Sequence, residues 1–446
     1  MFAALKTAGI SQKGLFEAAF TIGGRFVSIA LVIVSTKFLT TFLSESAYGQ
    51  LALYNITATL PSMFYFGPLG QGILRYYPIA KENGEIGPFH RQFNRLFQKG
   101  AVATLAAGLV FFIIFRCMGH ITWSIAALLI AMLSVVSAFN TFRYGLQNAS
   151  RKRTLALGLE TGDRVIQQAL AILLLWLVCD DPLIVMAGYL VSSLVFMAIN
   201  RHYYRQTFPD TVLAPGKTHA APYEREILNY SWPFILFGAF YWMQSASERW
   251  TLELLQSTEM VGQYAVLNQI GFQSQTLLFG SISYFLFPIL FNRAGNLTNN
   301  RQLEHANLLN NWYLKFNLLL TAILVVVFWQ FGEPVIRLLS HEKYAGVAAY
   351  LPLTALAGGL FNYAQNFSNR YMMALQTRKL IVPKVAASIA GIIFNLAGTY
   401  WFGLKGLIVS VALTQAFYVL MILAVWRTTE KSMTTNAPLL SNEKNY

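Results

Sequence analysis

The sequence predicts an all-α polytopic membrane protein with twelve transmembrane helices, arranged as two six-helix bundles related by an internal repeat. The first observation behind this prediction is composition. Hydrophobic residues make up 55% of the chain and charged residues only 12%, whereas charged residues are roughly a quarter of a soluble domain. The second observation is a series of long apolar stretches, and the third is the return of short motifs in the second half of the chain.

Twelve apolar stretches are long enough, or nearly so, to cross the hydrocarbon core of a bilayer as helices. The first stretch is too long for the core of a cleavable signal peptide and is predicted to be an uncleaved signal anchor. In chain order the stretches cover residues 15–41, 48–77, 96–116, 121–145, 155–178, 183–203, 227–255, 261–291, 308–331, 347–375, 380–402 and 404–426.

The repeat is visible in the motif over residues 49–55, GQLALYN, which returns over residues 262–268 as GQYAVLN. The same offset of 213 positions pairs Gly67 with Gly280. Two similar halves laid end to end are typical of transporters that rock one bundle against another. We therefore predict an N-terminal bundle over 1–204, a cytoplasmic linker over 205–226, a C-terminal bundle over 227–427 and a cytoplasmic tail over 428–446.

The orientation follows from the distribution of Lys and Arg. Most of the 33 basic residues lie at the termini and in the even-numbered connections, while the odd-numbered connections carry only Arg116, Arg337, Lys343 and Lys405. The positive-inside rule then places both termini in the cytoplasm. Because most of the +14 net charge is explained by topology, we expect no nucleic-acid partner.

No catalytic pattern is found. The six His and two Cys residues form no metal-ligand spacing, and neither a phosphate-binding loop nor a nucleophile elbow is present. The outer connections are too short for an external catalytic domain. We therefore expect no enzyme activity and no cofactor. Cys117 and Cys179 are predicted to be free buried thiols, with an external disulfide as the alternative.

A few basic residues fall inside the apolar stretches, where each costs about 2.5–3.5 kcal/mol to insert. Arg25 either pairs with an acidic residue of a neighbouring helix or lines an anion pathway. Arg164 lies beside Glu160 and Asp163, so a structural network is the alternative to binding. Arg249 and Lys315 are further candidates.

Amide and aromatic side chains could form a hydrated cavity for a hydroxyl-rich cargo. Asn362, Asn366 and Asn369 follow i, i+4, i+7 spacing on one helix face. The alternative is that such side chains hydrogen-bond helices together within the bilayer. Pro61 and Pro233 are expected to bend or interrupt their helices. The remaining cavity candidates are Asn55, Asn268, Gln273, Tyr241 and Trp242.

Two motifs resemble a known family. The YGQLA motif at residues 48–52 and the FGPLGQGILRYY motif at residues 66–77 are similar to the polysaccharide transporter branch of the multidrug/oligosaccharidyl-lipid/polysaccharide exporter superfamily. The resemblance covers essentially the whole chain. It implies two six-helix bundles in the bacterial cytoplasmic (inner) membrane and a cationic cavity for the diphosphate of a polyprenyl-linked oligosaccharide.

The resemblance implies a flippase that moves this lipid-linked O-antigen or exopolysaccharide unit from the inner to the outer leaflet, with polysaccharide polymerase machinery as a candidate partner. Rival hypotheses are a multidrug/cation antiporter of the same fold and a membrane-embedded polysaccharide enzyme. Diphosphate contacts are assigned to Arg25, Arg249, Arg164 and Lys315. Coupling carboxylates are assigned to Glu17, Glu160 and Asp163.

Overall fold

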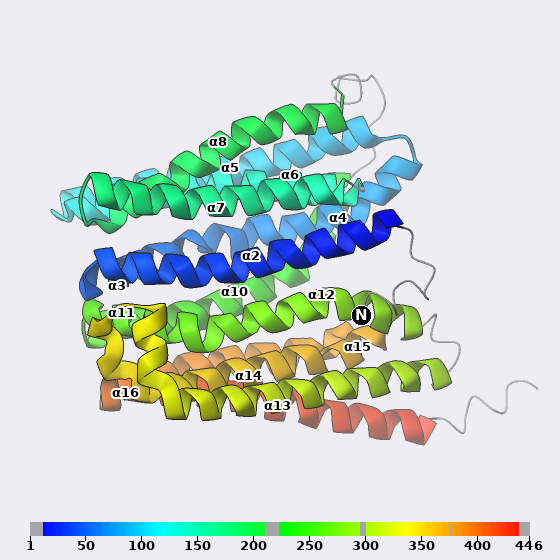
Figure 1. The fold of residues 1–446 in the computed structure, drawn as a ribbon. Helices are drawn as coiled ribbons and strands as arrows, with labels where there is room; N and C mark the ends of the chain where they lie inside the picture. Colours follow the sequence, from blue (N-terminus) through cyan, green and yellow to red (C-terminus); the bar gives the residue numbers. More distant parts are fainter. Residues whose placement is uncertain (1–11, 151, 210–222, 295–299, 375, 437–446) are drawn as a thin grey trace, which may run out of the picture. The chain divides into compact units, whose positions relative to one another are not determined.

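The computed structural model describes residues 12–150, 152–209, 223–294, 300–374 and 376–436. These residues are almost entirely helical, and none of them forms a strand (Figure 1). The chain divides into two compact units, which are described separately. Unit 1 contains residues 1–242 and 258–262, and unit 2 contains residues 243–257 and 263–446.

The helices of unit 1 pack both on neighbours in the chain and on more distant helices. The most extensive contacts are those of α5 with α6, α7 with α8, α6 with α8 and α2 with α7. The elements are α2 (Gln12–Phe42), α3 (Glu45–Ala58), η1 (Ser62–Phe66), α4 (Gly67–Glu82), α5 (Ile86–Cys117), α6 (Ile121–Ala149), α7 (Arg153–Leu177), α8 (Pro182–Thr207) and the first part of α10 (Tyr223–Leu255).

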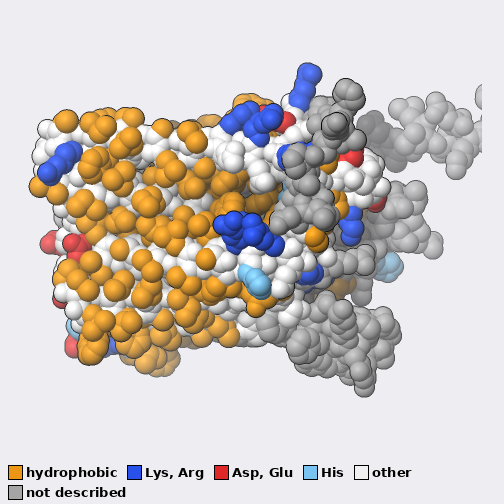
Figure 2. All heavy atoms as spheres, turned by 90° about the horizontal axis from the view of Figure 1, so that it is seen from above, with side chains coloured by type: hydrophobic (Ala, Val, Ile, Leu, Met, Phe, Trp, Pro, Cys, Tyr) orange, Lys and Arg blue, Asp and Glu red, His pale blue; other side chains and the backbone are white. Residues whose placement is uncertain are grey.

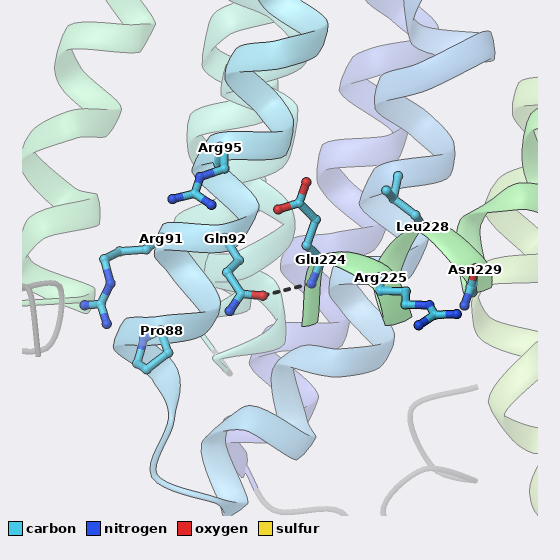
Figure 3. Close-up of a pocket in the computed structure, with 8 residues that line it drawn as sticks. All are labelled: Pro88, Arg91, Gln92, Arg95, Glu224, Arg225, Leu228 and Asn229. Carbon is cyan, nitrogen blue, oxygen red and sulfur yellow. Dashed lines mark hydrogen bonds between the residues drawn. The ribbon is translucent and has the colours of Figure 1, made fainter. Parts of the chain in front are cut away.

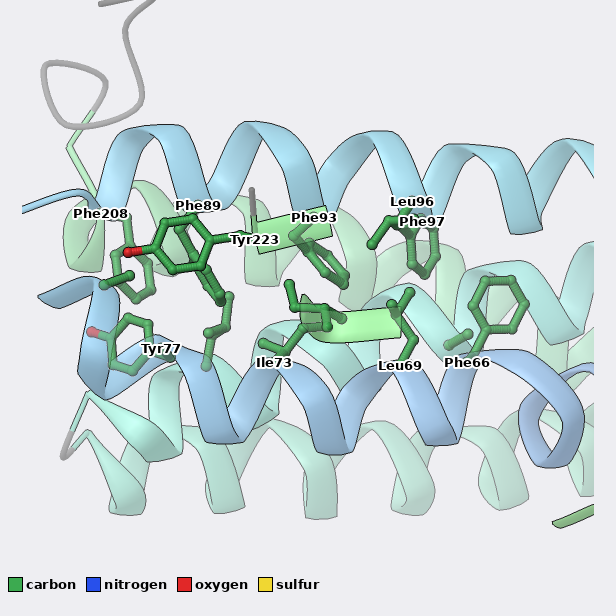
Figure 4. Close-up of a cluster of buried hydrophobic side chains, with 14 of the residues drawn as sticks. Phe66, Leu69, Ile73, Tyr77, Phe89, Phe93, Leu96, Phe97, Phe208 and Tyr223 are labelled. Carbon is green, nitrogen blue, oxygen red and sulfur yellow. The ribbon is translucent and has the colours of Figure 1, made fainter. Parts of the chain in front are cut away.

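One end of unit 1 holds a large aromatic core. Figure 4 shows Phe89, Phe93 and Phe97 of α5 facing α4. Phe93 also stacks on Phe142 of α6, with ring centroids 3.6 Å apart. Phe208 and Tyr223, which flank the undescribed connection between α8 and α10, pack into the same cluster. Burial of these large rings therefore fixes the start of α10 against α4 and α5.

The predicted helix over 48–77 is interrupted as its proline suggested. The α-helical run ends at Ala58, and Pro61 caps a short π-helix, η1, before α4 begins at Gly67. Pro61 has no amide hydrogen to donate to the preceding turn, so the regular hydrogen-bond ladder cannot continue through it. At Pro233 the expected interruption does not occur, because α10 continues through that residue.

Unit 2 is centred on α14, which packs against α13, α16 and η2. The single apolar stretch predicted over 261–291 also contains a π-helix, η2. The elements after α10 are α11 (Thr258–Leu267), which begins in unit 1, η2 (Asn268–Gln273), α12 (Ser274–Ala294), α13 (Asn300–Leu339), η3 (Glu342–Tyr350), α14 (Leu351–Phe367), α15 (Asn369–Met373), η4 (Thr377–Leu380) and α16 (Ile381–Asn436).

The long element α16 is two helical arms joined at Gly403. The φ of Gly403 is 56° and its ψ is −138°, a conformation that glycine adopts readily because it has no Cβ. The break falls between the predicted stretches 380–402 and 404–426, so this boundary is confirmed. A Cβ on Gly398 would lie 2.6 Å from the Gly406 carbonyl oxygen, so the two arms meet through a glycine contact.

Two glycines also mediate a close crossing within unit 1, between α3 and the start of α11. A Cβ added to Gly49 would collide with the Thr258 carbonyl oxygen and lie 2.9 Å from the Gly262 nitrogen. A Cβ added to Gly262 would collide with the Glu45 carbonyl oxygen and lie 3.2 Å from the Gly49 nitrogen. The contact is thus reciprocal: each glycine meets the backbone of the other helix.

Six helical segments of the described chain are long and apolar enough to cross a membrane, namely 86–117, 121–149, 182–207, 303–339, 342–373 and 378–427. Many of their large side chains are exposed, including Leu109, Val110 and Phe111 of α5 at 52–53%. Figure 2 shows hydrophobic side chains covering much of the visible face. Soluble proteins rarely expose so large an apolar surface. The protein is a multi-pass membrane protein.

Candidate functional site

The two predicted residues of the first helix lie outside the described side chains. Arg25 and Glu17 belong to α2, but their side chains are not among those described. The assignment of Arg25 to a diphosphate and of Glu17 to coupling therefore stays a prediction from the sequence.

Arg164 and Glu160 form an ion pair one turn apart on α7. The nearest nitrogen and oxygen are 2.7 Å apart, and the two side chains are 49% and 36% exposed. This is the i,i+4 pair expected from the sequence. Partly exposed pairs contribute little to stability. Glu160 offsets the charge of Arg164, and the arginine side chain stays accessible to solvent.

Asp163 is a buried carboxylate in unit 1. Its Oδ1 accepts hydrogen bonds from Ser192 Oγ and Gln167 Nε2, each at 3.3 Å. Gln167 also donates to Ser193 Oγ at 2.9 Å, and Asn140 donates to the Ser193 carbonyl oxygen at 2.8 Å. Neutral donors from α7 and α8 therefore hold this carboxylate, and no basic side chain among the described residues forms an ion pair with it.

A second buried carboxylate lies in unit 2. Glu248 of α10 accepts a hydrogen bond from the Tyr264 hydroxyl at 2.7 Å, and that hydroxyl accepts one from Asn268 Nδ2 at 3.2 Å. Arg249 completes the group: its guanidinium lies 3.8 Å from the Glu248 carboxylate and 3.5 Å from Asn268 Oδ1. Arg249 also donates to the Ser245 carbonyl oxygen at 3.1 Å.

The structure thus brings together Arg249 and Asn268, which were predicted as separate candidates. The arginine side chain remains 14% exposed. Sequence reasoning missed the central role of Tyr264, although Glu248 and Tyr264 lie next to predicted site residues in the chain. A tyrosine hydroxyl can donate to a carboxylate and accept from an amide at the same time, and here it links α10 to α11 and η2.

The amide stripe of α14 and α15 lies inside unit 2 and joins helices. Asn362 donates to Thr276 Oγ1 of α12 at 3.4 Å and to the Gly358 carbonyl oxygen of its own helix at 2.7 Å. Asn366 accepts from Ser283 Oγ of α12 at 3.2 Å. Asn369 donates to Asn310 Oδ1 at 3.3 Å. All three predicted asparagines are buried. These contacts match the helix-joining alternative more closely than a wall of an open cavity.

Trp242 also forms a hydrogen bond within the protein. It donates from Nε1 to the Ile56 carbonyl oxygen at 2.9 Å and packs edge-on against Phe64. It therefore joins α10 to α3 near the π-helix η1.

The other polar candidates are more accessible. Asn55 of α3 and Tyr241 of α10 are exposed, and Gln273 of η2 is partly exposed. Lys315 of α13 is exposed, with its ammonium 5.6 Å from the ring centroid of Trp312. Part of the surface of each of these side chains is therefore open to a ligand.

The two cysteines differ from the prediction in their exposure. Cys117 and Cys179 are free, as expected, but exposed rather than buried. Their positions at the end of α5 and just after α7 explain this exposure, because helix ends are incompletely covered by neighbours.

A cationic pocket in unit 1 was not predicted as a site. It is lined by Arg91, Arg95 and Arg225 together with Glu224 and neighbouring side chains of α5 and α10 (Figure 3). In the sequence these arginines indicate only the orientation of the chain in the membrane. The available signal was the i, i+4, i+8 spacing of Arg91, Arg95 and Lys99, which places three cations on one face of α5.

Residues 17–293 match the family model described as polysaccharide biosynthesis protein. The chain belongs to this family. The match covers more than half of the sequence and includes both resemblance motifs and both π-helices. No curated protein matches this member of the polysaccharide biosynthesis family in sequence.

Solved structures share the fold. An inward-facing multidrug resistance MATE family transporter of the MOP superfamily has 11% identity and a TM-score of 0.65, over 93% of this chain and 96% of that one. The lipid II flippase MurJ, in an inward closed conformation, has 14% identity and a TM-score of 0.67, over 93% and 87%. The Vibrio cholerae MATE transporter VcmN has 13% identity and a TM-score of 0.62, over 95% and 97%. The polysaccharide biosynthesis family member therefore has the fold of membrane transporters.

Proposed function

We propose that the protein is a flippase that moves a polyprenyl-diphosphate-linked oligosaccharide from the inner to the outer leaflet of the bacterial cytoplasmic membrane. The observation that carries this proposal is the match of residues 17–293 to the polysaccharide biosynthesis family. An O-antigen or exopolysaccharide repeat unit is the proposed cargo, and polymerase machinery on the outer side would consume it.

The need for such a protein is physical. A diphosphate and a set of sugar hydroxyls lose their hydrogen bonds to water in hydrocarbon, so the headgroup requires a polar path. Arg249 supports this role, because neutral oxygens and one carboxylate hold it while its side chain keeps 14% of its surface exposed. We assign diphosphate binding to Arg25, Arg249, Arg164 and Lys315. Charge-assisted hydrogen bonds from arginine suit phosphate oxygens.

The accessible polar residues are the better candidates for sugar contacts. Asn55, Gln273 and Tyr241 keep exposed surface, whereas Asn362, Asn366 and Asn369 are engaged in helix packing. We therefore propose that the exposed polar residues contact sugar hydroxyl groups and that the three asparagines stabilise helix packing.

The proposal includes twelve spans, cytoplasmic termini and alternating access by two related six-helix bundles. The glycine crossing supports the repeat. Gly49 and Gly262 are 213 positions apart, as are Glu45 and Thr258. Gly49 meets Thr258 while Gly262 meets Glu45, so the contact obeys the two-fold reciprocity expected of repeat-related elements.

A cation antiporter is the second candidate, and Asp163 is the observation that favours it. A buried carboxylate whose hydrogen-bond donors among the described residues are neutral can exchange a proton or bind a cation. The same residue fits the flippase proposal as a coupling carboxylate, together with Glu17 and Glu160. The two candidate functions therefore differ in the cargo rather than in this residue.

Reconstituted protein separates them. The full chain is placed in liposomes that carry a fluorescent polyprenyl-diphosphate sugar in both leaflets, and dithionite reports the rate at which the inner pool becomes accessible. A parallel experiment follows a quaternary ammonium dye under proton and sodium gradients. The proposal expects lipid flipping without dye transport. Dye transport without flipping would replace it with the antiporter.

A further inference from the structure

The cationic pocket of unit 1 lies between two helices that are held together by hydrogen bonds. It is an open pocket of about 610 Å³, within the range of about 300–1,000 Å³ that small-molecule sites occupy. Figure 3 shows that one wall is the first part of α5, with Arg91, Gln92 and Arg95, and that the other is the first part of α10, with Glu224 and Arg225.

Hydrogen bonds fix the two walls relative to each other. Gln92 Oε1 accepts the backbone amide hydrogen of Glu224 at 2.8 Å. The Tyr223 hydroxyl donates to Glu85 Oε2 at 2.6 Å, and the ring of Tyr223 packs against Phe89. The separation of the arginines is therefore set by the fold before any ligand arrives, which lowers the entropy that binding must overcome.

The lining has a clear excess of positive charge. Three arginines and one carboxylate, that of Glu224, line the pocket, and Lys99 forms an ion pair with the same carboxylate. In Figure 3 the side chains of Arg91 and Arg225 point away from Glu224 on opposite sides. Arg95 and Arg225 are exposed, so their guanidinium groups can reach a ligand. Arginine presents planar pairs of N–H donors that match phosphate oxygens. With Lys99 counted beside the three arginines and Glu224, the formal excess is three positive charges. A diphosphate diester, with two negative charges, therefore neutralises more of this excess than a monoanionic phospholipid does.

The predicted spans place the pocket at the depth of a lipid headgroup. Arg91 and Arg95 immediately precede the predicted span 96–116, and Arg225 precedes the predicted span 227–255. Both walls are thus at the entry of apolar helices, on the side that the positive-inside rule assigns to the cytoplasm. A lipid chain could remain in the bilayer while its headgroup occupies the pocket.

We infer that this pocket is a loading site which receives the diphosphate of a lipid-linked saccharide at the inner leaflet, before the headgroup enters the transport path. This inference rests on the proposed flippase function and extends it: the pocket adds a peripheral contact to the residues proposed for translocation. Its ligand chemistry is a diphosphate presented on a membrane lipid rather than in solution.

A binding experiment tests the inference on the full-length protein in lipid nanodiscs. Polyprenyl diphosphate, polyprenyl monophosphate, inorganic pyrophosphate and phosphatidylglycerol serve as separate probes. The test variant is Arg95→Gln with Arg225→Gln. The matched control is Lys81→Gln with Arg201→Gln, which removes two exposed cations of unit 1 that do not line the pocket. Arg95→Lys with Arg225→Lys keeps the charge but removes the planar donors.

The expected result is that the Gln test variant binds polyprenyl diphosphate about tenfold more weakly, as loss of charged hydrogen bonds predicts. The control should bind as the native protein does, and the Lys variant should fall between them. Unchanged binding by the folded Gln variant overturns the inference. Equal competition by inorganic pyrophosphate or phosphatidylglycerol overturns the assignment to a lipid-borne diphosphate.

Flipping is measured separately in liposomes with the same proteins. If the native protein flips the lipid-linked sugar and the Gln variant binds diphosphate normally, the loading site fails while the proposed function stands. If the native protein does not flip it, the proposed function fails, and the binding comparison still decides whether the pocket holds diphosphate lipids.

Discussion

The glycine crossing between α3 and α11 gives the sharpest test of packing. Replacing Gly49 or Gly262 by Ala adds one methyl group inside a helix. At an open helical position this change stabilises a protein by roughly 0.5–1 kcal/mol, because glycine loses more backbone entropy on folding. At Gly49 and Gly262 the added Cβ would collide with a backbone carbonyl oxygen of the opposite helix. A backbone atom cannot rotate away as a side chain can.

The expected magnitude follows from these two effects. Overpacking typically costs about 1–3 kcal/mol, and an obstacle made of backbone places this site at the upper end. After subtraction of the helix-propensity gain, each substitution should destabilise the protein by about 2 kcal/mol. The two values should be similar because the contact is reciprocal. The double variant should cost less than their sum, since helices separated by the first methyl group leave room for the second.

The assay is the apparent melting temperature of the purified protein in one detergent, followed by size-exclusion chromatography after heating. Gly280→Ala is the matched control, because Gly280 is helical and exposed and a Cβ there meets nothing within 4 Å. Gly49→Ala and Gly262→Ala should melt below the native protein, and Gly280→Ala at or above it. If all three variants melted alike, the close crossing would be refuted.

Three further predictions concern charge. Arg249→Gln should destabilise the protein by about 3 kcal/mol because it leaves Glu248 buried without its cation. Adding Glu248→Gln should restore the melting temperature but not lipid flipping, and recovery of both would make the pair purely structural. Asp163→Asn keeps the shape of the side chain and its place among Ser192 and Gln167, so the protein should fold. Gradient-driven flipping should fall while gradient-free exchange persists, and unchanged gradient dependence would remove Asp163 from coupling. Arg25→Ala should express normally yet fail in polysaccharide export, with partial rescue by Arg25→Lys; normal export at native expression would show that Arg25 is not required.

The sequence predicts helical class and several boundaries well because these depend on local signals. Gly403 marks the turn between two apolar stretches, and Pro61 marks the break before η1. Both residues act through their own backbone chemistry, so no knowledge of neighbours is needed. Pro233 shows the limit of this reasoning: α10 continues through it, because packing in the folded protein decides whether a proline ends a helix.

The candidate site is harder to predict because it depends on which side chains meet. The stripe predicted on one helix is divided between α14, which holds Asn362 and Asn366, and α15, which holds Asn369. Its spacing could not reveal that Asn310 and Ser283 of neighbouring helices contact it. Likewise the spacing of Arg91 and Arg95 on α5 could be seen in the sequence. Arg225 joins them in the lining of the cationic pocket only because α10 packs on α5. Periodicity defines a face, and tertiary structure supplies its partners.

The turn at Gly403 also sets the length of the second arm of α16, which can be compared with the thickness of a bilayer. Tyr400, Trp401 and Phe402 precede it and are 69%, 69% and 70% exposed, as expected of aromatic side chains that settle at the boundary between headgroups and acyl chains. From this boundary the second arm of α16 rises for about 35 Å before it reaches Trp426 and Arg427. The arm therefore has aromatic side chains at each end, separated by slightly more than the hydrocarbon thickness of a typical bilayer. A thinner membrane would force this arm to tilt, and the cost of that mismatch would favour membranes whose thickness fits it.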